Sequence, residues 1–198
     1  MFRTIWTNLL PLFGVKTMKK QVLFSGSPEL LNPVREALKK SHGIESMRVK
    51  FFNDVPEDFE GAGRYYISVV AHIRSLNPRM VVVDEDATPQ NRILVLAARE
   101  LDIPTLIVQH GMFGVKSAFI PMVADHIAVW GEESRKKLIE WGVPDSKITV
   151  TGNPKYDKLC DYINSNQKSD KFQVTGNIVN DARYIVVQKG ESNEAPKS

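Results

Sequence analysis

Residues 80–111, which read MVVVDEDATPQNRILVLAARELDIPTLIVQHG, decide the fold. Two short apolar runs, Met80–Val83 and Thr105–Val108, enclose a segment with apolar residues at helical spacing. Those residues are Ile93, Leu94, Ala97, Ala98 and Leu101. Thr88 is expected to be the N-cap of this helix and Pro89 its first residue. Continuous apolar strands are typical of a parallel sheet covered on both faces, so this unit predicts an α/β fold.

The same alternation continues on both sides of this unit. We expect further strands at Gln21–Ser25, Met47–Phe52, Asp125–Trp130 and Lys147–Thr151. We expect further helices at Glu29–Ser41, Gly63–Leu76 and Glu132–Trp141, the last of them ended by Gly142, with a polar loop over 53–60. Strands that alternate with helices imply right-handed crossovers. The sequence therefore predicts a Rossmann-like, doubly wound parallel sheet within residues 19–163.

Both ends of the chain differ from this pattern. In residues 1–18, one helical face would carry Phe2, Trp6, Leu9, Leu10 and Phe13, flanked by basic residues. Such an amphipathic segment either packs on the domain or a partner, which we favour, or contacts a membrane surface. Residues 164–198 are polar, so we expect a flexible tail, with Tyr184–Val187 as one further strand.

Composition excludes several classes of protein. The chain has 198 residues, and Lys+Arg 26 against Asp+Glu 23 gives a charge of only +3, too weak to indicate nucleic-acid binding. Cys160 is the single cysteine, so neither an internal disulfide nor a thiolate zinc site can form. No run reaches the ~18 apolar residues of a membrane-spanning helix. We expect a cytoplasmic protein, with peripheral contact at the inner membrane face as the open alternative.

Residues that follow the strands are the candidates for function, because ligands of open parallel sheets bind beyond the carboxyl ends of the strands. As substrate-binding residues we take Gly26, Ser27, Gln109, Gly111, Gly131, Glu132 and Asn153. His110 is the foremost catalytic candidate, because imidazole can take a proton from an acceptor hydroxyl at neutral pH. The alternative is a structural histidine at the end of a strand.

Asp84, Glu85 and Asp86 form a second candidate group. One interpretation is a D-x-D pair, which in some sugar transferases holds a divalent metal on a diphosphate. In the other, an acid orients a substrate hydroxyl or caps the following helix, as acids commonly do. We take Asp84 and Asp86 as catalytic candidates and expect no metal site and no cofactor, since the four histidines lack metal-ligand spacing. No phosphate-binding P-loop or nucleophile-elbow motif is present.

Three segments together resemble a known family. They are VVVDEDATP, IPTLIVQHGMFG and ADHIAVWGEESRKKLIEWGVPDSKITVTGNPKYD, the last being the most specific. Over about Lys19 to Leu159, the sequence resembles the N-terminal half of two-domain GT-B enzymes of surface-polysaccharide biosynthesis. The most similar groups are capsule and CDP-glycerol glycerophosphotransferases and the UDP-N-acetylglucosamine 2-epimerases.

One loop distinguishes the alternatives within this resemblance. The epimerases carry an acid in the loop where this sequence has Gln109-His110-Gly111, whereas the transferases carry a histidine–glycine pair. The resemblance therefore favours a transferase, with His110 as base for the acceptor hydroxyl and Asp84 or Asp86 orienting the acceptor. The alternatives are a 2-epimerase-like protein and a non-catalytic module that binds a partner subunit.

GT-B enzymes bind the nucleotide-activated donor mainly through a C-terminal domain. Only about 40 residues follow Leu159. One βαβ unit alone needs ~30 residues, so a complete second domain cannot fit in this segment. The resemblance thus implies a truncated chain that is incomplete alone, with a partner chain as one source of the missing half. Its ligands would be a nucleotide-activated donor and a polysaccharide or glycerol-type acceptor.

Overall fold

The computed structural model describes residues 21–49, 54–157, 159, 172–179 and 182–189. The chain divides into two compact units, residues 1–155 and residues 156–198. The amphipathic segment expected at residues 1–18 lies outside the described residues.

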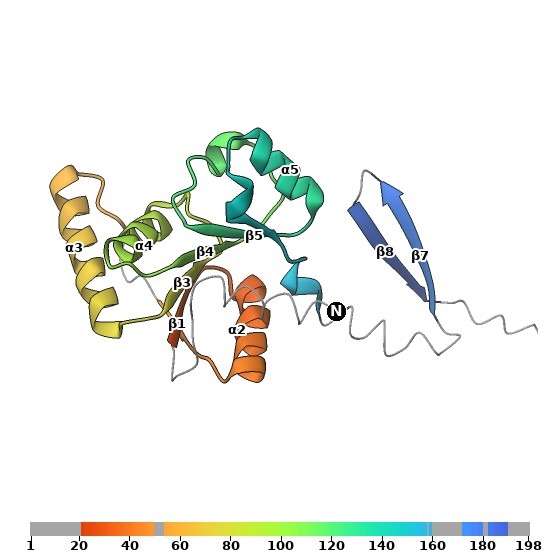
Figure 1. Cartoon of the computed structure of the whole chain (residues 1–198), viewed down its shortest axis with the longest axis horizontal. Helices are drawn as coiled ribbons and strands as arrows, with labels where there is room; N and C mark the ends of the chain where they lie inside the picture. Colours follow the sequence, from red (N-terminus) through yellow and green to blue (C-terminus); the bar gives the residue numbers. More distant parts are fainter. Residues whose placement is uncertain (1–20, 50–53, 158, 160–171, 180–181, 190–198) are drawn as a thin grey trace, which may run out of the picture. The chain divides into compact units, whose positions relative to one another are not determined.

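The first unit is built on a six-stranded parallel sheet with the strand order β2-β1-β3-β4-β5-β6; Figure 1 labels β1, β3, β4 and β5 of this sheet. Its strands are β1 (Gln21–Ser25), β2 (Glu45–Arg48), β3 (Met80–Val83), β4 (Thr105–Val108), β5 (His126–Val129) and β6 (Ile148–Val150). Every residue of β3, β4 and β5 is buried, as expected for strands covered on both faces. The predicted Rossmann-like α/β fold is confirmed.

Helices cover both faces of this sheet (Figure 1). They are α2 (Pro28–His42), α3 (Phe59–Leu76), α4 (Pro89–Glu100) and α5 (Glu132–Glu140). On one face, Leu30, Leu31, Val34 and Leu38 of α2 pack against side chains such as Phe24 and Val82. On the other face, α3, α4 and α5 pack against the alternate side chains of the strands, including Leu23 and Val81. This division follows from the period of two along each strand.

The order of the strands locates a switch in the direction of winding. The chain passes from β1 outward to β2 and then returns to β3 on the other side of β1. The carboxyl ends of β1 and β3 are therefore neighbours, with Ser25 paired to Val83. A ligand crevice is expected at this point in open α/β sheets.

Two elements begin earlier than the sequence predicts. The helix expected from Gly63 begins at Phe59, because the Asp58 carboxylate accepts a hydrogen bond from the Gly61 amide (2.7 Å) and caps it. β2 covers Glu45–Arg48 instead of Met47–Phe52; residues 50–53 lie outside the described residues. This strand is at the edge of the sheet, and its four residues are either exposed or half-buried with none fully buried, so its hydrophobic signal is weak.

The expected ends of two helices are confirmed. Thr88 is the N-cap of α4 and Pro89 its first residue. Gly142 follows α5 with φ +95°, and the Val143 amide bonds to the Leu138 carbonyl at 2.9 Å. That pattern is a Schellman-type helix end, which favours glycine.

The second unit contains an antiparallel pair of strands, β7 (Phe172–Val179) and β8 (Ala182–Lys189). The strand expected at Tyr184–Val187 lies inside β8. The sequence analysis does not predict β7, although its Val174, Thr175 and Ile178 have high strand propensity. Residues 160–171 and 190–198 lie outside the described part of the chain. Among the helices that are described, none is long and apolar enough to cross a membrane.

Candidate functional site

The carboxyl ends of β3 and β4 bring His110 and Asp84 together. The Nδ1 atom of His110 lies 3.0 Å from the backbone carbonyl oxygen of Asp84. A carbonyl can only accept, so Nδ1 carries the proton and donates it. In the neutral imidazole this leaves the lone pair on Nε2, for which the described residues offer no hydrogen-bond partner. His110 is exposed, so this lone pair is available to a ligand.

The carboxylate of Asp84 connects three elements. Its Oδ2 accepts a hydrogen bond from the Ser27 amide at 2.7 Å, and its Oδ1 accepts one from Asn91 Nδ2 at 3.3 Å. Asn91 projects from α4, and its Oδ1 accepts a hydrogen bond from the Ser25 hydroxyl at 2.7 Å. The ends of β1 and β3 and the start of α4 are thus held by one polar network at the switch point.

Gly26 is required by this network. Its φ is +137°, a conformation that L side chains rarely adopt. A Cβ built on Gly26 would lie 2.2 Å from both Cγ and Oδ1 of Asp84. The turn after β1 can therefore approach Asp84 this closely only with glycine at position 26.

Asp86 lies below the surface, with 3% of its area exposed. Its Oδ2 accepts hydrogen bonds from the amides of Val123 (2.6 Å) and Ala124 (3.0 Å), at the end of the loop between β4 and β5. Burial raises the pKa of this carboxyl above its usual value, against the opposing effect of the two amides and of Arg92. These contacts suit a residue that holds the loop, so Asp84 is the better placed of the two acids to meet a ligand.

Gln109 is also a loop-holding residue and is 1% exposed. Its Oε1 accepts a hydrogen bond from the Trp130 amide and its Nε2 donates to the Gly111 carbonyl, both at 2.8 Å. Its own carbonyl accepts the Trp130 indole N–H at 2.8 Å. The side chain that we expected to bind substrate is therefore engaged within the protein, where it fixes the turn that carries His110.

The remaining predicted residues lie at the same edge of the sheet but outside the network. Glu132 begins α5 and pairs with Arg135 at 3.0 Å, and Gly131 is the N-cap of that helix. Asn153 accepts a hydrogen bond from the Lys155 amide at 3.1 Å. Among the bonds between described residues, none joins Glu132 or Asn153 to Asp84 or His110.

Aromatic rings support His110 from the side of the loop. The His110 ring stacks on Phe119 with 5.8 Å between centroids, and Phe119 makes an edge contact with Phe113 at 4.5 Å. Both phenylalanines contact Trp141, which follows α5. The loop between β4 and β5 thus packs where a crossover helix would otherwise lie.

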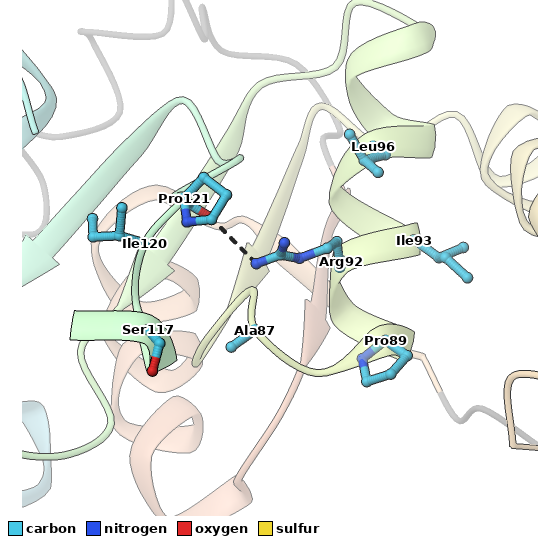
Figure 2. A pocket seen from close by; sticks show the side chains of 8 residues that line it. All are labelled: Ala87, Pro89, Arg92, Ile93, Leu96, Ser117, Ile120 and Pro121. Atoms are coloured by element: carbon cyan, nitrogen blue, oxygen red, sulfur yellow. Dashed lines mark hydrogen bonds between the residues drawn. The ribbon is translucent and has the colours of Figure 1, made fainter. Parts of the chain in front are cut away.

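An open groove of about 450 Å³ lies between this loop and α4 (Figure 2). The guanidinium of Arg92 crosses it, donating from Nε to the Asp86 carbonyl (2.9 Å) and from Nη2 to the Pro121 carbonyl (3.3 Å). Its walls are mostly apolar, with Ile93 and Leu96 on α4 and Ile120 on the loop. Neither Asp84 nor His110 lines this groove.

Comparison with known proteins identifies the class of fold. No family model and no curated protein matches the sequence. Solved structures that resemble the chain include a UDP-N-acetylglucosamine 2-epimerase from Rickettsia bellii, with a TM-score of 0.56 and 19% identity over 78% of this chain and 50% of that one.

Two further 2-epimerases are similar. The Neisseria meningitidis enzyme, solved with UDP-GlcNAc bound, has a TM-score of 0.54 and 18% identity over 76% of this chain and 50% of that one. The Methanocaldococcus jannaschii enzyme has a TM-score of 0.53 and 18% identity over 77% of this chain and 50% of that one. At these identities the likeness concerns the fold: a Rossmann-like, GT-B-type half-domain. The chain spans about half the length of the structures it matches.

Proposed function

We propose that this chain is the acceptor-side half of a transferase that moves a sugar or glycerophosphate group from a nucleotide-activated donor to a hydroxyl. His110 accepts the proton of the acceptor hydroxyl on Nε2 as that oxygen attacks the donor, and the nucleotide leaves with the bond electrons. Asp84 orients the acceptor through its carboxylate. Asp86 and Gln109 hold the loop and the turn in place.

The observation that carries this proposal is the hydrogen bond between His110 Nδ1 and the Asp84 carbonyl. A backbone carbonyl in this position fixes one tautomer and leaves Nε2 as a base directed to solvent. A histidine that only ended the strand would not need its second nitrogen open at the carboxyl edge of the sheet, beside the topological switch point. The position and the tautomer together favour proton abstraction.

The donor requires groups on both sides of the crevice, because group transfer needs water excluded and polar groups converging on the reacting atoms. We propose that a second domain or a partner chain supplies the other side. The 198-residue chain alone should then show no turnover above background and only weak nucleotide binding.

The test uses the protein tagged and purified under mild conditions together with any chain that accompanies it. Nucleotide release from CDP-glycerol and from several nucleotide-sugars is measured with and without an acceptor. Acceptor-dependent release that His110→Asn abolishes supports the proposal. Asn can still donate a hydrogen bond to the Asp84 carbonyl but is no base, so this variant separates chemistry from local structure. Release that survives His110→Asn overturns the proposal.

The likeness to three 2-epimerases favours a second candidate function, epimerisation of a nucleotide-sugar. The same purified material incubated with UDP-N-acetylglucosamine and no acceptor distinguishes the two. Epimerised sugar without an acceptor indicates the 2-epimerase. Turnover of no donor by the accompanied chain leaves the third candidate, a non-catalytic module that binds a partner subunit.

A further inference from the structure

We infer that the groove between α4 and the loop that joins β4 to β5 binds a small amphipathic carboxylate, with its charged group on Arg92 and its apolar body on Leu96. The groove takes no part in the proposed transfer, so this inference goes beyond the proposed function. Its volume of about 450 Å³ is within the range of small-molecule sites, about 300–1,000 Å³. Apolar walls around one cation select a ligand by charge and by hydrophobicity together.

The guanidinium of Arg92 is the polar centre of the groove. It points from α4 toward the loop, where Nε donates to the Asp86 carbonyl at 2.9 Å and Nη2 to the Pro121 carbonyl at 3.3 Å (Figure 2). Both acceptors are uncharged, and a guanidinium has five N–H donors. Among the described residues, no carboxylate pairs with Arg92 and nothing accepts from Nη1. A half-buried cation of this kind is completed by an anion from outside the chain.

Two acids lie near Arg92 in sequence, and neither pairs with it. The charge of Arg92 acts on the Asp86 carboxyl through space, but Asp86 is 3% exposed and its Oδ2 is bonded to two backbone amides of the loop. Glu85 is bonded to two amides at the start of α4. The amides of that helix end are therefore engaged, and a ligand anion would depend on the guanidinium.

The apolar part of the site lies one helical turn further along α4. Leu96 is four residues after Arg92, on the same face of the helix, and is 39% exposed. Ile120 and Pro121 line the groove from the loop. Four residues of helix rise about 6 Å, a span that a short aliphatic chain can cover. A ligand lying from Arg92 toward Leu96 also leads away from Glu85 at the start of the helix.

A carboxylate suits this site better than a phosphate. The groove offers one positive charge, which the single negative charge of a carboxylate balances, and the two groups match in hydrogen-bond geometry. A phosphate monoester carries about −1.5 to −2 charges and would need a second cation. Lys116 is the cation nearest in the sequence of the loop, and it does not line the groove.

Occupation of the groove should be felt at His110. Phe119 belongs to the same loop as Ile120 and stacks on the His110 ring with 5.8 Å between centroids. A ligand that contacts both α4 and the loop holds this segment in place, and with it the ring that supports His110. The groove would then regulate the strand-end site without contacting it.

Titration of the ¹⁵N-labelled full chain tests the inference by nuclear magnetic resonance. The probes are hexanoate, its uncharged counterpart hexanamide, acetate as the charged group alone, and hexyl phosphate. We expect hexanoate to shift the Nε–H signal of Arg92 and the amides of Leu96, Ser117 and Ile120. Its Kd should be at least about tenfold below those of hexanamide and acetate, the scale of one hydrogen bond to a charged group. Equal affinity for hexanamide or acetate, tighter binding of hexyl phosphate, or shifts confined to other residues overturn the inference.

Two variants separate the charge from the apolar wall. Arg92→Gln removes the cation, so the affinity for hexanoate should fall at least about tenfold while that for hexanamide stays the same. Leu96→Gln should weaken both and leaves the bonds of Arg92 intact, so it tests the groove even if loss of the cation disturbs the loop. The matched control is Ile139→Gln on α5, which is 42% exposed, does not line the groove and should change neither affinity. Unchanged hexanoate binding in Arg92→Gln or in Leu96→Gln overturns the site.

The link to His110 has its own readout. Saturating hexanoate should shift the ring ¹⁵N signals of His110, and the shift should shrink in Phe119→Leu, which removes the stacked ring. Hexanoate bound in the groove with unchanged His110 signals overturns this link. All of these measurements report binding without turnover, so the transferase proposal can fail while the groove still binds its carboxylate.

Discussion

The carboxylate of Asp84 occupies the place that a side chain on Gly26 would fill, 2.2 Å from the ideal Cβ position. The two residues are far apart in sequence and meet because β1 and β3 are neighbours in the sheet. The close approach lets Asp84 take the Ser27 amide and keeps the turn after β1 against β3. The close packing at the switch point thus depends on the missing side chain of Gly26 and on the carboxylate of Asp84.

Gly26→Ala should destabilise the fold. The methyl group would displace Asp84, and alanine would be held at φ +137°, so we expect the free energy of unfolding to fall by about 1–3 kcal/mol. Urea denaturation followed by circular dichroism measures the change.

Gly63→Ala is the matched control for this substitution. Gly63 is an exposed residue of α3 with nothing within 4 Å of the added Cβ. Alanine there should raise stability by about 0.5–1 kcal/mol, because glycine weakens a helix interior. In a double-mutant cycle, Gly26→Ala should reduce the free energy of unfolding less when Asp84→Ala is also present. Strictly additive effects of the two substitutions would contradict the proposed clash.

The fold was largely predictable because buried strands and buried helix faces consist of apolar residues that can be recognised in the sequence. β3 and β4 are continuous apolar runs, and their observed bounds agree with those expected from the sequence. β2 begins two residues before the expected strand. An edge strand buries few side chains, and the apolar residues within 47–52 favoured a later start in the sequence-based prediction. The start of α3 was missed because the cap is a single hydrogen bond from Gly61 to Asp58.

The site was only partly predictable. Strand ends could be recognised, but which polar residues serve the fold and which face solvent depends on contacts between distant segments. Asn91 was missed, although it lies at helical spacing from the buried Leu94, Val95 and Ala98. A polar residue within an apolar stripe is the signal that would have found it. Gln109 was correctly placed at the edge, yet its bonds to Trp130 and Gly111 could not be inferred from sequence.

Gln109→Glu should weaken the turn that carries His110. Glutamate can still accept from the Trp130 amide but places an oxygen against the Gly111 carbonyl, where Nε2 now donates. We expect a loss of about 1–3 kcal/mol, the cost of a buried polar group without its partner. Urea denaturation reports it, and Gln90→Glu in the first turn of α4 is the control, since an acid there suits the helix dipole. An unchanged midpoint for Gln109→Glu would show that the turn does not depend on this amide.

Asp86→Ala should loosen the loop between β4 and β5. Removing the carboxylate leaves the Val123 and Ala124 amides without their acceptor, and each such loss costs about 1–3 kcal/mol. Asp86→Asn retains an oxygen that both amides can reach, so its stability near neutral pH should stay close to that of the parent. Thermal unfolding of the three proteins checks this order; equal destabilisation by Ala and Asn would mean that the charge, not the acceptor, matters.

His126 should make the fold less stable in mild acid. Burial, with a smaller effect from Lys147, lowers the pKa of this imidazole below its usual 6.5. At mildly acidic pH the unfolded chain therefore binds a proton at His126 more readily than the folded chain does. The free energy of unfolding is highest above the pKa of the unfolded state and decreases as pH falls below that pKa. Urea midpoints measured between about pH 7.5 and 5.5 should decline, and less so in His126→Gln. The same decline in both proteins would assign it to other groups.

The tautomer of His110 can be observed directly. If Nδ1 donates to the Asp84 carbonyl, the neutral ring carries its proton on Nδ1 and leaves Nε2 bare. In water a free imidazole prefers the opposite tautomer, so the ¹⁵N shifts of the ring above neutral pH should be reversed relative to those of the exposed His42. Phe119→Leu, which removes the ring stacked on His110, should restore part of the ordinary pattern. A His110 ring protonated on Nε2 would leave the proposed base without its lone pair directed at the ligand, and the proton-abstraction role would then have to be abandoned.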